Sequence, residues 1–267
     1  MHLSTSWFLA LSACSSTLFA QPSAGDVLKA ARETLGGGKL AAVESLTVSG
    51  ESANGPLLTD LTLSIQLPDK FLREQILTMM SGAIPGRQGM NPEAMAALGR
   101  PTAVDGLNGE EQWSALRMSP DSQVDIASLG RGVQSQFEAR QKDFKRTFTR
   151  FLLALLLADR PDFRVEFTYF SEMPEPEGGV ADALDGTGPG DFKIRLFIDR
   201  KTHLPRMIAY PTGNNITQLW ISKYKDEGGV WMPHSLSWML NGNETERFDI
   251  KKVRLNPKFA ANKFSKQ

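Results

Sequence analysis

The stretch that decides the fold begins with the strand Leu61-Thr62-Leu63-Ser64-Ile65-Gln66-Leu67, turns at Pro68-Asp69-Lys70-Phe71, and ends at Asp105-Gly106 and Gln112-Trp113. Apolar and polar residues alternate along its first strand, so one face is apolar and the other can meet water. A strand of this kind is typical of an antiparallel sheet that covers a core on one side. The stretch therefore indicates a β-rich fold.

Turn sequences divide the rest of the chain into further strands. Asn54-Gly55-Pro56 predicts a hairpin between strands 43–52 and 57–67, and Asn241-Gly242 predicts another near the C-terminus. A loop rich in Pro, Gly and acidic residues is expected at 173–190. The remaining strands are expected at 71–78, 102–118 (two short strands around a turn at 105–109), 162–172, 191–199, 206–210, 217–224, 230–240 and 246–255.

Two helices are expected among these strands. Residues 25–36 place apolar side chains on one side and stop at Gly36-Gly37-Gly38. Residues 121–160 form the longest helical stretch, and its end, 151–158, is apolar on every side and too short for a bilayer. Such a helix needs burial. The sequence thus predicts an α+β fold, mainly antiparallel β, in which a curved half-barrel sheet of about 10–11 strands wraps around helices.

Charge and composition exclude some classes of function. Lys and Arg together number 30, as do Asp and Glu, so nothing favours nucleic acid as a partner. No Gly-x-Ser-x-Gly or phosphate loop is present, and His203 and His234 lack the spacing of zinc ligands. We expect no cofactor, no metal and no enzymatic activity.

The N-terminal 20 residues predict an export signal. The apolar stretch beginning at Trp7 ends at Ala20, before polar sequence, which places a mature domain at 21–267 in the periplasm. Two alternatives stay open: a short retained helix, or lipidation of Cys14, the only cysteine, which would anchor the chain to a membrane. The mature sequence has no stretch of about 20 apolar residues. Peripheral membrane contact is therefore the most that we expect.

The order of short motifs resembles the LolA/LolB family of periplasmic lipoprotein carriers. The shared landmarks are an N-terminal amphipathic helix, Pro68-x-x-Phe71, Asp105-Gly106 ahead of Trp113, and the closing Val253-Arg254-Leu255-Asn256-Pro257. The resemblance implies a curved sheet that holds the acyl chains of lipoproteins or lipids. Two features depart from the family: Leu67 stands where its carrier has an arginine, and a methionine-bearing flap is inserted at 79–101.

The expected function is therefore a non-catalytic, monomeric carrier of hydrophobic ligands. The alternative is an envelope sensor or assembly factor, whose cavity is filled and which binds a protein partner instead. In the carrier, apolar strand residues, flap methionines, tryptophans and the apolar helix would line the cavity; in the alternative the same residues form solid core. The candidate cavity residues are Leu63, Ile65, Phe71, Met79, Met80, Trp113, Phe148, Phe151, Leu155, Trp220 and Trp238.

Overall fold

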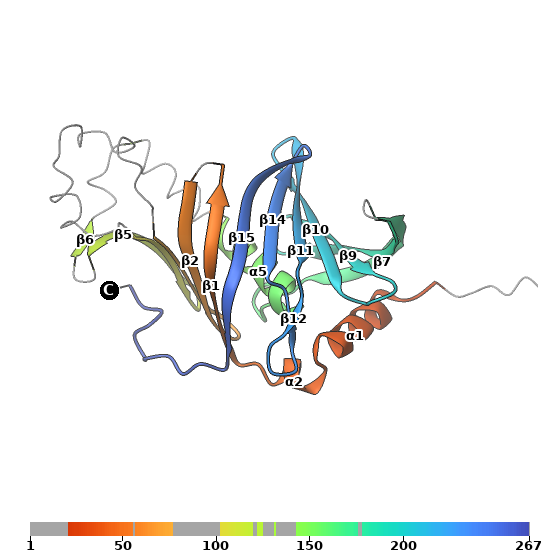
Figure 1. Ribbon diagram of the computed structural model, residues 1–267, viewed down its shortest axis with the longest axis horizontal. Helices are drawn as coiled ribbons and strands as arrows, with labels where there is room; N and C mark the ends of the chain where they lie inside the picture. The colour runs from red at the N-terminus through yellow and green to blue at the C-terminus, as the bar shows by residue number, and fades with distance from the viewer. Residues whose placement is uncertain are drawn as a thin grey trace, which may run out of the picture.

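The computed structural model describes residues 21–55, 57–76, 102–119, 122–124, 131, 143–175 and 178–266. Within these ranges, thirteen antiparallel strands form one curved sheet in the order β6-β5-β4-β3-β2-β1-β15-β14-β11-β10-β9-β8-β7 (Figure 1). The sheet stays open, with β6 and β7 as its edges, and encloses a helix on its concave side. The predicted mainly antiparallel half-barrel is confirmed, with two or three more strands than expected.

The sheet is built almost entirely from hairpins between neighbouring strands. Two more short strands, β12 (Lys225–Asp226) and β13 (Trp231–Met232), pair separately. The strands of the large sheet are β1 (Ser45–Asn54), β2 (Leu57–Gln66), β3 (Lys70–Ile76), β4 (Thr102–Asn108), β5 (Glu111–Ser119), β6 (Ser122–Val124), β7 (Glu166–Pro174), β8 (Val180–Gly188), β9 (Phe192–Asp199), β10 (Pro205–Thr212), β11 (Asn215–Ser222), β14 (Ser235–Leu240) and β15 (Asn243–Leu255).

The pairing register of β2 with β1 places every second residue of β2 in the core. Leu63 pairs with Val48 and Ile65 with Leu46 in the neighbouring β1, and all four side chains are fully buried. Because directly opposed residues share one face of an antiparallel pair, this apolar row continues across the concave side. The alternation seen in the sequence therefore defines the core.

Helix α5 (Phe144–Leu156) fills much of the concave side. The fully buried Phe148 stacks on Phe71 of β3 at 4.6 Å between ring centroids, and Phe144 and Phe151 lie 5.5 and 5.9 Å from the same ring. The helix ends at Leu157 in a left-handed conformation. Its apolar surface is thus used to pack the protein's own core.

The shorter helices α1 (Ala24–Leu35) and α2 (Gly38–Ala41) lie at one end of the sheet, below it in Figure 1. A capping box between Ser23 and Asp26 begins α1, and hydrogen bonds from Ser23 lower the pKa of the Asp26 carboxyl. The apolar face of α1 is buried, and the helix contacts β7 and β13.

A second, smaller core covers the opposite face of β3–β5. Trp113 on β5 packs there with Leu72 and Val104, and the C-terminal segment folds back so that Phe264 covers them. The Trp113 indole Nε1 donates a hydrogen bond of 3.0 Å to the Phe264 carbonyl. This end of the chain therefore belongs to the folded structure.

Several local predictions were wrong. Asp105-Gly106 lies inside β4, not in a turn, because Ser114 bonds Asp105 and the Trp113 ring occupies the space where Gly106 lacks a side chain. Residues 122–124 form a strand, and α5 begins only at Phe144. The expected strand 230–240 is interrupted at Pro233 and His234.

The expected loop at 173–190 also contains a strand, β8. Its Ala, Asp and Gly residues have low strand propensity, but β7 and β9 pair with it on both sides. An added side chain at Gly186 would collide with Ile194 and Phe167, so tertiary packing selects the small residue. The predicted signal at 1–20 and flap at 79–101 lie outside the described residues.

Candidate binding cleft

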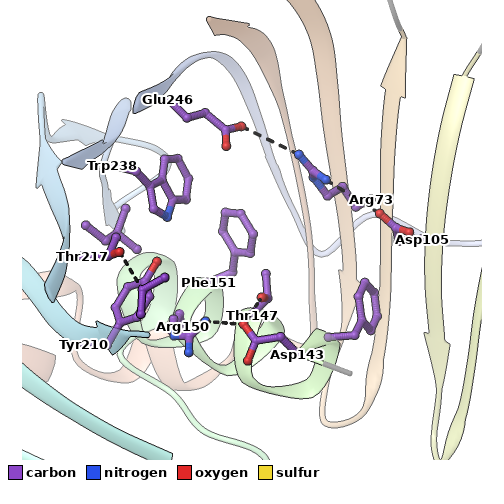
Figure 2. Close-up of a pocket in the computed structure, with 13 residues that line it drawn as sticks. Arg73, Asp105, Asp143, Thr147, Arg150, Phe151, Tyr210, Thr217, Trp238 and Glu246 are labelled. Carbon is purple, nitrogen blue, oxygen red and sulfur yellow. Dashed lines mark hydrogen bonds and ion pairs between the residues drawn. The ribbon is translucent and has the colours of Figure 1, made fainter. Parts of the chain in front are cut away.

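A cleft of about 470 Å³ lies on the concave side between the N-terminal half of α5 and the sheet (Figure 2). Its volume is in the range typical of small-molecule sites. One part of the lining is apolar or aromatic, and the other is charged or hydroxyl-bearing. The lining residues are Arg73, Asp105, Asp143, Phe144, Thr147, Arg150, Phe151, Tyr210, Thr212, Thr217, Leu219, Trp238 and Glu246.

Helix spacing and strand pairing bring the apolar part together. Phe144 and Phe151 are two turns apart on α5, so they lie on one face of the helix. On the sheet, Leu219 of β11 pairs directly with Trp238 of β14. The Phe151 and Trp238 rings meet edge to face at 5.8 Å. These four side chains make up the apolar floor of the cleft.

A charged belt borders the floor on the side of β3, β4 and β15 (Figure 2). The Arg73 guanidinium lies 3.7 Å from the carboxylates of both Asp105 and Glu246. Hydroxyl groups hold these acids in place: Ser114 donates to Asp105 at 2.7 Å and Ser52 donates to Glu246 at 2.8 Å. The belt thus carries two carboxylates and one guanidinium.

A second ion pair borders the floor on α5. The Arg150 Nη1 donates to the Asp143 carboxylate at 2.8 Å, and the Arg150 guanidinium lies 3.9 Å from the centroid of the Tyr210 ring. Burial raises the pKa of Tyr210, and the positive charge of Arg150 opposes this in part. The phenol is therefore neutral at physiological pH and can donate or accept hydrogen bonds.

The carboxylates of the cleft are paired within the protein. In the described part of the chain, no group of three or more His, Cys, Asp or Glu residues is placed to hold a metal ion. The carboxylates pair with guanidiniums or hydroxyls of the protein, and Thr212 shares a hydrogen bond of 2.7 Å with Thr217. A ligand can gain most by covering the apolar floor, because removing apolar surface from water is favourable without polar contacts.

The structure distributes the predicted cavity residues among three places. Phe151 and Trp238 line the cleft. On the other face of the sheet lie Trp113, in the smaller core, and Trp220, whose neighbours Leu219 and Ile221 point into the main core. Met79 and Met80 lie outside the described residues. The remaining five are at most 1% exposed in the main core: Leu63, Ile65, Phe71, Phe148 and Leu155.

The sequence predicts only apolar and aromatic cavity residues and does not predict the charged and hydroxyl-bearing side of the cleft. A signal for Arg73 existed, because the period of two in β3 puts it on the same face as Phe71. A charge on a predicted apolar face is unusual and points to a site. For Arg150, Tyr210 and Glu246 no such signal exists, because only the fold brings α5, β10 and β15 together.

Known proteins resemble this chain in structure but not in sequence. No protein-family profile and no curated protein matches the sequence. None of the helices in the described ranges is long and apolar enough to cross a membrane. Among solved structures, the chain is similar to a LolA superfamily protein from Nitrosomonas europaea, with 11% identity and a TM-score of 0.50 over 92% of this chain and 99% of that one.

The chain is similar to two further solved structures. A DUF1329 family protein from Desulfovibrio piger has 9% identity and a TM-score of 0.52 over 90% of this chain and 95% of that one. The complex of Pseudomonas aeruginosa MucA and MucB has 13% identity over 89% of this chain and 61% of that one, but its TM-score of 0.27 supports no argument. The predicted resemblance is confirmed at the level of structure: the chain has a LolA-like fold.

Proposed function

We propose that this protein is a periplasmic, non-enzymatic carrier that binds one acyl chain of a lipoprotein or lipid in the cleft beside α5. The observation that carries the proposal is the apolar floor of Phe144, Phe151, Leu219 and Trp238 in a concave space of about 470 Å³. The LolA-like fold supports it, since that fold is associated with carriers of hydrophobic ligands. The predicted signal at 1–20 supports the compartment.

The packing of α5 limits the capacity of the site. Next to the cleft, Phe71, Phe148 and Leu152 are fully buried, so the protein's own side chains fill that part of the concave side. A single chain that buries roughly ten methylenes gains about 8 kcal/mol. That corresponds to micromolar affinity before the costs of ordering are subtracted. One chain with reversible binding is therefore the expected stoichiometry.

The same filled core favours a second candidate function. A LolA-like half-barrel whose interior is occupied by its own helix can serve as an envelope sensor or assembly factor that binds a protein partner. In that case the cleft beside α5 takes up no acyl chain.

Lipid analysis of the purified mature protein separates the two functions. The carrier should release acyl lipid on solvent extraction, detected by mass spectrometry, and should bind a fluorescent fatty-acyl probe with one site. Thr147→Trp should weaken probe binding at least about tenfold, because the half-buried Thr147 lines the cleft and an indole would occupy its space.

Thr168→Trp is the matched control, because Thr168 is exposed on β7 and does not line the cleft. It should leave probe binding unchanged, and thermal unfolding should show that both variants are folded. A wild-type protein with neither extracted lipid nor probe binding would exclude the carrier and leave the second candidate.

A further inference from the structure

We infer that the cleft selects its ligand by charge: it accepts an amphiphile with an uncharged or cationic end and rejects one with an anionic end. This inference rests on the proposed function, since it concerns the same cleft. It adds the chemical class of the ligand, which neither the fold nor the apolar floor specifies.

The charges around the cleft carry the inference. Its lining holds two guanidiniums, on Arg73 and Arg150, and three carboxylates, on Asp105, Asp143 and Glu246. The described lining therefore has one negative charge in excess. Arg146, outside the lining, lies 3.9 Å from Asp143, but both side chains are exposed there and solvent screens this pair. An anionic end group would enter a site with net charge of its own sign, which disfavours its ionised form.

Both guanidiniums are already paired with carboxylates of the protein, and the Arg150 Nε–H, which has no acceptor among the described residues, is buried from solvent. Arg150 pairs with Asp143 at 2.8 Å and covers the Tyr210 ring, so one of its faces is occupied. Arg73 lies between two carboxylates, each held by a serine hydroxyl. A ligand carboxylate could reach either guanidinium only by approaching one of these acids closely.

The apolar floor strengthens this effect. Phe151, Leu219 and Trp238 exclude water from one side of the cleft, and charges interact more strongly where the effective dielectric is lower. An uncharged end group avoids the repulsion and can hydrogen-bond to the hydroxyls of Thr147, Thr212 or Tyr210, which line the same space. A cationic end gains from the excess carboxylate.

Three competitors with the same twelve-carbon chain test the inference. Dodecanol, dodecyltrimethylammonium and dodecanoate are titrated, below their micelle-forming concentrations and at about pH 8, against a bound neutral fluorescent probe. We expect the first two to displace the probe, and dodecanoate to need at least about a tenfold higher concentration. Added salt should narrow the difference, because it screens exposed charges.

Glu246→Gln locates the effect. The substitution preserves shape and an acceptor for Ser52 but removes one negative charge, so the dodecanoate concentration needed for displacement should fall several-fold relative to that of dodecanol. Glu111→Gln is the matched control, because Glu111 is exposed on β5 and does not line the cleft. It should change neither value.

The possible outcomes test charge selection and the carrier function separately. Equal displacement by all three competitors, or strongest displacement by dodecanoate, overturns charge selection and leaves the carrier standing. No displacement by any of them, together with no probe binding, removes the carrier itself. Selectivity that persists unchanged in Glu246→Gln also overturns the inference, since its cause would then lie elsewhere.

Discussion

Arg160 is a single buried charge that joins α5 to the segment just after it. Its side chain is fully buried just after α5, and its guanidinium donates two hydrogen bonds, at 2.8 and 2.5 Å, to the Asp162 carboxylate. It also lies over the Phe148 ring, and Lys145 of α5 lies 3.7 Å from Asp162. A buried guanidinium without its carboxylate is strongly destabilising.

Asp162→Asn should therefore lower the free energy of unfolding by about 1–3 kcal/mol at neutral pH. Partial burial acts to raise the pKa of Asp162, but hydrogen bonds and the charge of Arg160 outweigh it, so the pKa lies below the ordinary 3.8. A carboxyl with a lowered pKa stabilises the fold above that ordinary value, and the contribution is lost as the pH falls below it. As the pH falls, the difference in unfolding free energy between the wild type and Asp162→Asn should therefore become smaller.

Urea unfolding at about pH 7 and about pH 3 measures this difference. Glu166→Gln is the control, because it removes an exposed carboxylate from the neighbouring strand β7. If Asp162→Asn lowered the free energy of unfolding by the same amount at both pH values, the ion pair would not be the cause.

At the scale of elements, α5 is the part whose packing decides how much room the half-barrel keeps. Phe148 is fully buried and stacked on Phe71, so Phe148→Ala should cost about 3–5 kcal/mol of unfolding free energy through lost contacts and a new cavity. Phe170→Ala on β7, where the ring is 48% exposed, should cost less than about 1 kcal/mol.

Denaturant unfolding of both variants tests this contrast. If Phe148→Ala cost no more than Phe170→Ala, α5 would not be part of a tightly packed core. The concave side would then have more room than the structure shows, and more than one chain could enter.

At the scale of the whole molecule, the C-terminal segment closes a core that the sheet alone leaves open. Phe259 and Phe264 pack edge to face at 5.1 Å over the face that carries Trp113, and Lys263 pairs with Glu74 of β3 at 2.7 Å. Truncation after Pro257 should remove this cover and expose Trp113 to water.

The truncated protein should lose about 2–4 kcal/mol of unfolding free energy, because burying one phenylalanine is worth about 1.5–3 kcal/mol. Its tryptophan fluorescence should shift to longer wavelength, whereas truncation after Ser265 should leave both properties unchanged. Unchanged fluorescence in the shorter protein would mean that Trp113 is covered by other residues.

The sequence by itself determined the class of fold and the inward face of the strands with clear alternation. Leu63, Ile65 and Phe71 were predicted on one apolar face because a period of two is a local property of the backbone. Prediction from the sequence failed where small or acidic residues pair in the middle of the sheet, as in β8 and at Asp105-Gly106. Pairing with the neighbouring strands there outweighs the low strand propensity of these residues.

Only the tertiary structure decided which apolar residues are accessible and which charges meet. Phe151 and Trp238 line the cleft, while Phe148 and Leu155, of the same kind and on the same helix as Phe151, are core. The ion pair of Arg73 on β3 with Glu246 on β15 joins strands that are not neighbours in the sheet. A sequence pattern gives the direction of a side chain, but contact across a concave surface depends on curvature and on strands distant in the chain.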